Sequence, residues 1–476
     1  MVANAADACA QIVTLRYPAA TVRQGSVGAR FDAHRGVRSM STLLQNGLVV
    51  DGLGNPAYQG SVRIEGDTIV AAAPELSAQP GDEVVDLQGK TIMPGLIDAH
   101  CHVTLDEPHS NDEMFFHRRP GLGALVAAYN AQRVLRAGVT SIFDADCIFD
   151  LGVDLRDAIE AGIVQGPRMA SGGNALVTSV GGTAGLLIPD QGLRGYAKVV
   201  SNRDEIVKEV RRQIKYGVDW IKVHITGLVP RQKERGEVAA WNYEELKTVC
   251  DTAHDLGIPV VGHCRNAKSI ADAVRAGFDM ILHATFMDDA ALELLVEHKV
   301  PIVPTFTFQA NLADYGDRVG ADANLKEIFR REIEESAHMI RKAYEAGVPV
   351  LCGTESGFSL TPYGEWHYRE MEVFIRDIGF TPEAAIRAAT SECGRCLGLD
   401  GKIGAVEAGR LADLLVVNGD PTKDVTVLGN NDNIEDVYLN GKRLDLPPLP
   451  PRGSISGWQV SAYSSGKLHW KDVHGK

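Results

Sequence analysis

The sequence predicts an α/β protein: a (β/α)8 TIM barrel with a small β-sandwich domain built from both chain ends. Three observations predict this fold. Between residues 139 and 355, helices that end at glycine are repeatedly followed by apolar strands that close with a polar residue. Further apolar runs bring the strands of this kind to eight. Short strand patterns with turn pairs flank this region, at 43–73 and 402–444.

The repeating unit is clearest around two glycines. Gly217 precedes the apolar run VDWIKVHITG, and Gly277 precedes FDMILHATF. Glycine supplies the left-handed position that ends a helix, and a continuous apolar run suits a parallel strand buried on both faces. Helical periodicity marks connecting segments such as 202–217 and 269–277. The eight strands are expected within 91–100, 140–146, 167–176, 219–227, 259–266, 279–286, 299–308 and 349–356.

The domain organisation follows from the same patterns. Residues 91–395 are expected to form the barrel, and residues 40–90 and 396–476 the small β domain. Residues 1–39 contain arginines but no glutamate and no signal-like apolar run, so we interpret them as a disordered extension or as an upstream start that the working protein does not need, with a transit peptide as the alternative. The tail after Pro447 is rich in Pro, Gly and Ser and is expected to run over the surface.

Composition excludes several classes of function. The chain has 48 basic and 62 acidic residues, a net charge of -14, whereas nucleic-acid-binding surfaces are basic. No run approaches the roughly 20 apolar residues of a membrane helix. Cys393 and Cys396 have C-x-x-C spacing, but no second pair completes a zinc site, so we interpret them as structural. We expect a cytoplasmic protein that acts on a small-molecule substrate.

Four histidines follow predicted strands. His100 and His102 are two residues apart at the end of the first strand, so their side chains share a face. His263 closes the run IPVVGH and His283 the run DMILH. Because the C-terminal ends of barrel strands meet at one mouth, these imidazoles predict a metal site there. Imidazole suits zinc, cobalt, iron and nickel, so the ligands alone do not name the metal.

Three further polar residues stand at strand ends. Lys222 lies in the fourth strand, where a buried lysine needs a partner or a task. His224 is two residues further on, either as a rival metal ligand or as a group beside the substrate. Glu355 follows the eighth strand, where a carboxylate can take a proton from metal-activated water and pass it to a leaving nitrogen.

These motifs resemble the amidohydrolase superfamily, and within it the imidazolonepropionase and prolidase-like subgroup, which includes Xaa-Pro-type dipeptidases and ochratoxinase-type amidases. The resemblance extends from Leu43 to about Leu444. It rests on the segments MPGLIDAHCH, DWIKVHITG, GIPVVGHC, MILHATFMDD, VPTF, CGTESG, GFTPEAAIRAAT and GRLADLLVVNGDP.

The resemblance implies a ligand set and a cofactor. It implies one or two divalent ions, zinc first, with Co²⁺, Mn²⁺ or Fe²⁺ as alternatives, and a homo-oligomer. Lys222 would be carbamylated by CO₂, and the candidate catalytic residues are Glu355, Lys222 and His283. The candidate metal ligands are His100, His102, Lys222, His263, His283 and Glu355.

Three departures from the family pattern bear on its specificity. Glu355 stands where the family has aspartate, which affects the number of ions bound. The segment TSVGGTAG (178–185) lacks the glycine-histidine-glycine often found after the third strand, and Tyr363 replaces a common histidine. Since both loops face the substrate in this family, dipeptide specificity does not follow.

The sequence therefore predicts a metal-dependent hydrolase that acts on a C–N amide-type bond of an amide, urea or carbamate, including aryl or xenobiotic substrates. The alternative is an Xaa-Pro-type dipeptidase or N-acyl amino acid amidase, in which Arg265 would bind a substrate carboxylate. Peptidase activity therefore stays open. A deaminase is disfavoured because Cys264, Arg265 and Asn266 stand where a glutamate is expected, and a non-catalytic relative because the ligands are retained. The aromatic residues near strand ends either rim the pocket or cap the core: Phe306, Phe308, Tyr363 and Trp366.

Overall fold

The computed structural model describes residues 41–109, 119–180, 195–228, 237–453, 464 and 466–475. The extension predicted over 1–39 lies outside the described residues, as do positions 181–185 of the loop TSVGGTAG. The described part of the chain is an α/β protein, as predicted. Among its helices, none combines the length and the apolar composition that crossing a membrane requires.

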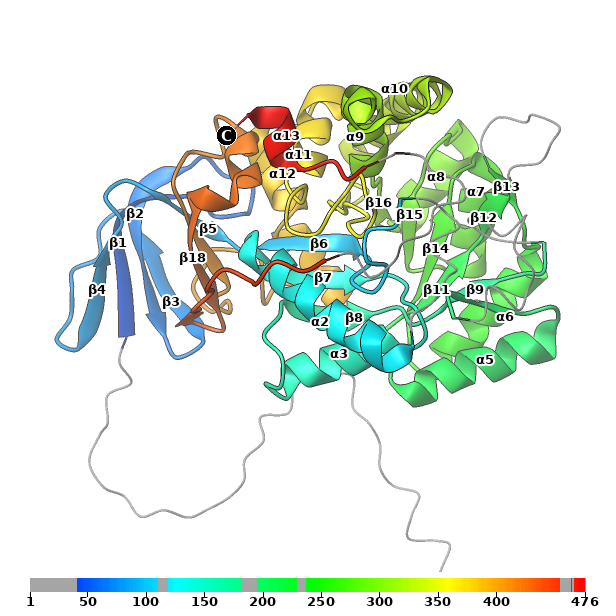
Figure 1. Ribbon diagram of the computed structural model, residues 1–476, viewed down its shortest axis with the longest axis horizontal. Helices are drawn as coiled ribbons and strands as arrows, with labels where there is room; N and C mark the ends of the chain where they lie inside the picture. Colours follow the sequence, from blue (N-terminus) through cyan, green and yellow to red (C-terminus); the bar gives the residue numbers. More distant parts are fainter. Residues whose placement is uncertain are drawn as a thin grey trace, which may run out of the picture. The chain divides into compact units, whose positions relative to one another are not determined.

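One mixed sheet combines strands from both chain ends (Figure 1). Its order is β19-β18-β17-β5-β1-β2-β3, and β4 also pairs with β1. In this sheet β5 is antiparallel to β17, with Met93 opposite Leu415, which joins the N-terminal strands to the C-terminal ones. A second layer that would make this sheet a sandwich stays a prediction. The strands are β1 (Ser41–Val49), β2 (Tyr58–Glu65), β3 (Thr68–Ala73), β4 (Asp82–Asp86), β5 (Thr91–Pro94), β17 (Leu414–Val417), β18 (Ile434–Leu439) and β19 (Lys442–Arg443).

The segment predicted as one strand over 91–100 is two strands. Residues Thr91–Pro94 form β5 in the mixed sheet, whereas Leu96–Cys101 form β6, which pairs with β7. Gly95 lies between them against Thr140, where an added Cβ would lie 2.1 Å from the Thr140 Oγ1. The chain therefore changes sheet at a position where only glycine fits.

The remaining larger sheets are parallel and alternate with helices. One has the order β6-β7-β8 and the other β10-β9-β11-β14-β15-β16. Their strands are β6 (Leu96–Cys101), β7 (Val139–Asp144), β8 (Arg168–Ser171), β9 (Ala175–Val177), β10 (Ala197–Val199), β11 (Ile221–His224), β14 (Val260–Cys264), β15 (Met280–His283) and β16 (Ile302–Val303). The helices are α2 (Pro120–Arg136), α3 (Leu151–Glu160), α5 (Arg203–Tyr216), α6 (Tyr243–His254), α7 (Ala267–Ala276), α8 (Asp289–His298), α9 (Thr307–Tyr315), α10 (Ala323–Glu345), α11 (Arg369–Val373), α12 (Pro382–Ala388) and α13 (Trp470–His474).

Helices α5 and α7 end as the sequence predicts, and α7 begins two residues before the predicted segment. The Asn202 side chain accepts a hydrogen bond from the backbone of Glu205 at the start of α5, and Asn266 caps α7 in the same way. Gly217 and Gly277 end these helices with φ values of 108° and 106°. The helices predicted over 202–217 and 269–277 are therefore confirmed.

Hydrogen bonds connect the parallel sheets to each other. The backbone N–H of Asp219 donates to the carbonyl of Ser171, at 2.9 Å, just before β11. Leu351 donates to Ile302 in β16, at 2.9 Å. Ala99 in β6 donates to Cys352, at 3.0 Å. The segment around Cys352 thus lies between β16 and β6.

A cluster of buried side chains, here called the interior cluster, receives residues from most of these parallel strands. Side chains two residues apart in a strand share a face. Trp220, which belongs to the cluster, therefore shares its face with Lys222 and His224, which lie further along β11. The 3-10 helix Ser391–Leu397 adds Cys393 and Cys396, both free thiols. The other members are Ile97, Ala99, Phe143, Ala145, Ala170, Val261, Met280, Leu282, Val303, Leu351 and Ile403.

Two segments differ from the predictions in detail. The strand predicted over 299–308 is only Ile302–Val303, because the backbone of Phe306 and the hydroxyl of Thr307 bond to the Glu370 carboxylate as α9 begins. In the tail, Leu468 is fully buried, so the expectation that the tail simply runs over the surface is wrong there.

Candidate active site

The structure brings five imidazole rings together at the C-terminal ends of the parallel strands: His100, His224, His263 and His283 lie within the last residues of their strands, and His102 follows β6 directly. His102 and His100 have ring centroids 4.9 Å apart, and His100 and His283 are 5.3 Å apart. The next distances are 4.3 Å from His283 to His263 and 5.2 Å from His263 to His224. All four histidines proposed as ligands from the sequence therefore lie in one arc, and His224 extends it.

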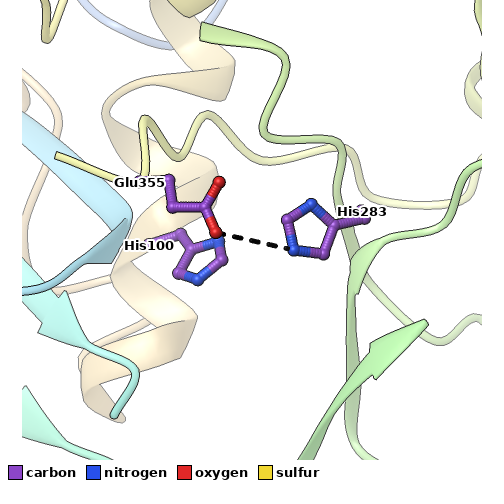
Figure 2. A group of neighbouring side chains, drawn as sticks. All are labelled: His100, His283 and Glu355. Atoms are coloured by element: carbon purple, nitrogen blue, oxygen red, sulfur yellow. Dashed lines mark ion pairs between the residues drawn. The ribbon is translucent and has the colours of Figure 1, made fainter. Parts of the chain in front are cut away.

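Three of the predicted residues approach each other closely enough to share a cation (Figure 2). The candidate ligand atoms of His100, His283 and Glu355 all lie within 4.8 Å of one another, and Nε2 of His283 is 4.0 Å from Oε1 of Glu355. Nε2 of His100 and both ring nitrogens of His283 are buried without a hydrogen-bond partner. A buried polar atom without a partner costs roughly 1–3 kcal/mol, a cost that an added ligand would remove.

The backbone is strained at the same place. His283, Thr305 and Glu355 all have positive φ values, of 67°, 57° and 54°. Such conformations cost roughly 1–3 kcal/mol each in residues other than glycine, and they persist where the surrounding structure imposes them. Thr305 is also in contact with the cluster, since its hydroxyl lies 3.0 Å from Nδ1 of His100. The strain therefore orients ring and carboxylate groups at the site.

Asp146 connects two of the rings. Nδ1 of His102 lies 2.7 Å from Oδ1 of Asp146 and 3.1 Å from its main-chain oxygen. Nε2 of His224 lies 2.7 Å from Oδ2 of the same carboxylate. Burial lowers the pKa of His102, but the nearby Asp146 carboxylate outweighs this and raises the pKa overall. His224 is thus a partner of Asp146, and its role as a metal ligand or as a group beside the substrate stays a prediction.

Lys222 and Glu355 line one small cavity with these rings. Burial lowers the pKa of Lys222, against the opposing charges of Asp146 and Glu355. Burial also raises the pKa of Glu355, so its carboxylate has a greater affinity for a proton than an exposed glutamate. The lining residues are His100, His102, Leu105, Asp146, Tyr196, Lys222, His224, His263, Glu355 and Phe358.

Arg265 is already engaged by acidic side chains. Its NH2 group donates to both carboxylate oxygens of Glu332, each at 2.6 Å, and its NH1 group lies 3.7 Å from Glu237. Glu237 in turn lies 3.0 Å from Nε2 of His263. Burial raises the pKa of Glu237, but the charges of His263 and Arg265 outweigh it and lower the pKa to about 2. The positive charge of Arg265 therefore offsets the negative charges of Glu332 and Glu237 beside the fifth strand.

The aromatic residues singled out from the sequence are mostly core residues. Tyr363 and Trp366 are each 1 % exposed, and Phe306 is fully buried. The Tyr363 hydroxyl donates to the backbone oxygen of His102, so this residue supports a candidate ligand from behind. The aromatic side chains on the cavity are instead Tyr196 and Phe358.

The family follows from a comparison of the sequence with those of known families. The family described as "Amidohydrolase family" matches residues 91–444. The chain belongs to this family. The match covers the parallel strands and four strands of the mixed sheet, β5, β17, β18 and β19.

The relatives agree with the subgroup that the motifs indicate. Ochratoxinase of Aspergillus niger is 26% identical over 438 residues, 87% of this chain and 88% of the relative. Imidazolonepropionase of Salmonella typhi is 22% identical over 380 residues, 75% of this chain and 86% of the relative. The crystal structure of a prolidase complexed with N-methylphosphonate-L-proline is 26% identical, with a TM-score of 0.72 over 85% of this chain and 99% of the other.

Several residues at the site were missed in the sequence. Asp146 ends TSIFDAD and carried the same signal as the histidines, a polar residue just beyond a strand. Asp98 lies in the same motif as His100, but the apolar residues around it in the strand gave no sign of a polar role. Glu237 is the first described residue after 229–236, and no sequence pattern connects it to His263.

Proposed function

We propose that this chain is a metal-dependent amidohydrolase that cleaves a C–N amide-type bond with water. The observation that carries the proposal is the cluster of His100, His283 and Glu355, whose ligand atoms lie within 4.8 Å of one another. Unpartnered buried nitrogens on both histidines support the view that a cation completes their coordination. Membership of the amidohydrolase family supports the hydrolysis of amide bonds.

The residues of the site fit a divalent cation. His100, His283 and Glu355 would bind one ion, with His102, His263 and a carbamylated Lys222 available for it or for a second one. Imidazole nitrogens and carboxylate oxygens suit zinc, and they also suit cobalt, manganese and iron. When bound, such an ion lowers the pKa of water and polarises a carbonyl group.

Carbamylation of Lys222 has a physical basis in its surroundings. The side chain is 1 % exposed, and burial lowers its pKa, which favours the neutral amine. A neutral amine can attack CO₂ to form a carbamate with release of a proton. Because burial penalises an anion as well as a cation, the carbamate would need the bound divalent cation beside it.

Glu355 is the proposed proton carrier. Its raised pKa, caused by burial, suits a base that takes a proton from water and then gives it to the departing nitrogen. The Glu355 backbone N–H donates to the His100 carbonyl at 2.6 Å, which keeps the carboxylate beside the rings. Asp146 fixes the orientation of His102, as carboxylates commonly do for metal-binding histidines.

We also propose that the parallel strands form a closed (β/α)8 barrel. The hydrogen bonds from Asp219 to Ser171, from Leu351 to Ile302 and from Ala99 to Cys352 support closure of the ring. The interior cluster supports it further, because side chains from β6, β7, β8, β14, β15 and β16 all contribute to it, together with Trp220 just before β11. In a barrel of this kind the site would lie at the C-terminal face, where the loops after the strands carry function.

For the substrate we favour an amide, urea or carbamate with an apolar or aryl group. Leu105, Tyr196 and Phe358 supply apolar surface on the cavity, and Arg265 is engaged by Glu332. The likeness to ochratoxinase supports an amide substrate without choosing between the two classes. The likeness to a prolidase complexed with N-methylphosphonate-L-proline supports the alternative, a dipeptide or N-acyl amino acid.

Removal and restoration of metal test the proposal. Purified protein is assayed on arylamides, arylureas, carbamates, N-acyl amino acids and Xaa-Pro dipeptides before and after exhaustive chelation, and again with Zn²⁺, Co²⁺, Mn²⁺ or Fe²⁺ added. We expect hydrolysis of at least one class, its loss on chelation and its return with metal. Hydrolysis that continues at full rate in protein with no measurable metal would refute the proposal.

A further inference from the structure

A buried carboxylate behind the site joins the strand that carries His100 to the segment that carries Glu355. Asp98 is 4 % exposed and accepts four hydrogen bonds. Its Oδ1 accepts from the backbone N–H of His100 at 3.1 Å and of Thr354 at 3.0 Å. Its Oδ2 accepts from the Thr354 hydroxyl at 2.5 Å and from Nδ1 of His367 at 2.8 Å.

These bonds act on the backbone of His100, a candidate ligand, and on Thr354, the residue before the candidate ligand Glu355. Thr354 immediately precedes Glu355, and its hydroxyl also accepts from the backbone N–H of Ser356 at 3.2 Å. Glu355 itself has a φ value of 54°, a conformation that costs free energy in a glutamate and must be imposed by its neighbours. Asp98 therefore holds the backbone at His100 and at Thr354, the residue that precedes Glu355.

The hydrogen bonds of His367 define which of its ring nitrogens carries a proton. Its Nε2 accepts a hydrogen bond from the backbone N–H of Gly364, at 3.1 Å. Because Nε2 must present a lone pair to that donor, the ring proton is on Nδ1 and points to Asp98. The ring is 6 % exposed, so the interaction is shielded from water. Neither Asp98 nor His367 is among the residues that line the cavity.

We propose that Asp98 and His367 form a positioning pair that holds Glu355 and His100 in the geometry required for metal binding. The inference rests on the proposed metal-dependent function. His367 aligns the Asp98 carboxylate, and the carboxylate aligns the backbone on both sides of the site. Partners of this kind typically change metal affinity by about 10-fold to 100-fold when they are lost.

Variants of His367 test the pair without removing the carboxylate. His367→Asn keeps an N–H donor near the position of Nδ1, whereas His367→Leu removes it. We expect His367→Leu to bind Zn²⁺ about 10-fold to 100-fold more weakly, in competition with a chromophoric chelator. His367→Asn should recover most of the affinity. Asp98→Asn should resemble His367→Leu, because an amide cannot accept all four bonds.

Asp413→Asn is the matched control for general loss of stability. Asp413 is 3 % exposed, accepts from the backbone N–H of Asn440 at 2.8 Å and pairs with Arg168 at 3.0 Å, next to β17 in the mixed sheet. We expect a lower melting temperature and unchanged Zn²⁺ affinity. Wild-type affinity in His367→Leu, or an equal loss of affinity in Asp413→Asn, would overturn the pair. If the wild-type protein binds no metal, the proposed function fails instead; if Asp98→Asn does not fold, the two His367 variants decide.

Discussion

Nε2 of His224 lies 2.7 Å from Oδ2 of Asp146, and both side chains are buried. The other oxygen of the same carboxylate lies 2.7 Å from Nδ1 of His102. The Asp146 carboxylate thus contacts two imidazole rings, and one of them, that of His102, is a candidate metal ligand. Burial opposes ionisation of Asp146, but the charges of His102 and Lys222 outweigh it and hold its pKa well below the ordinary value. This arrangement makes Asp146 the main source of negative charge beside His102.

Asp146→Asn should therefore weaken metal binding. The amide cannot supply the negative charge that stabilises the two rings, and its NH₂ group would face one of them. We expect Zn²⁺ affinity to fall about 10-fold to 100-fold, measured by chelator competition. His224→Gln keeps a donor toward Asp146 and should retain the full metal content. Loss of one equivalent of metal in His224→Gln would instead make His224 a ligand.

Lys222→Ala should lose metal and activity together. If the lysine carries a carbamate, its removal takes away an anionic ligand, and short carboxylic acids such as acetate or propionate should restore part of the activity. Metal content by elemental analysis and rates with and without the acids are the measurements. Lys247→Ala, a change of an exposed lysine on α6, is the control and should behave as wild type. Wild-type metal content in Lys222→Ala would rule out a carbamate ligand.

The parts of the fold set by local rules could be predicted from the sequence. Helices α5 and α7 were found because Gly217 and Gly277 end them and their apolar residues recur with the helical period. The convergence of His100 and His283 followed from a rule of topology, since both stand at strand ends. Such signals lie within a few residues of one another, so the sequence displays them.

The parts set by contacts between distant segments could not be predicted. Asp98 and His367 are 269 residues apart, and nothing in the sequence links them. Arg265 lies just past His263, so the sequence leaves it as a candidate for binding a substrate carboxylate. Its partner Glu332 is 67 positions away, and no sequence pattern links the two residues. The division of 91–100 into two strands depends on the close approach of Thr140 to Gly95, which is also a long-range contact.

Arg265→Ala should destabilise the protein and reduce activity on every substrate class. Removal of the guanidinium leaves Glu332 and Glu237 buried without their cation, and loss of one partner of a buried ion pair typically costs about 3–5 kcal/mol. The double variant Arg265→Ala/Glu332→Gln should recover part of the stability, measured by the urea midpoint. A loss of activity confined to carboxylate-bearing substrates would contradict this prediction and assign Arg265 to substrate binding.

Glu370 should make the stability of the protein fall as the pH rises above about 5. Burial raises its pKa to about 8, despite hydrogen bonds from Phe306 at 2.9 Å and Thr307 at 2.7 Å. An unfolded chain releases this proton near the ordinary glutamate value of 4.5, so between 4.5 and 8 the native state binds one more proton. The free energy of unfolding then decreases by up to about 1.4 kcal/mol per pH unit from this group alone. The contribution is constant below the unfolded pKa and again above the folded one.

Glu370→Gln isolates this effect because it keeps the size and an acceptor oxygen but cannot ionise. Urea midpoints of the wild type and the variant, measured between pH 5 and 8 at the same metal concentration, should diverge as the pH rises, with the variant progressively more stable relative to the wild type. Other titrating groups are common to both proteins, so they cancel in the difference. A constant difference over this range would mean that Glu370 is ionised in the native protein and that its hydrogen bonds from Phe306 and Thr307 offset the cost of burial.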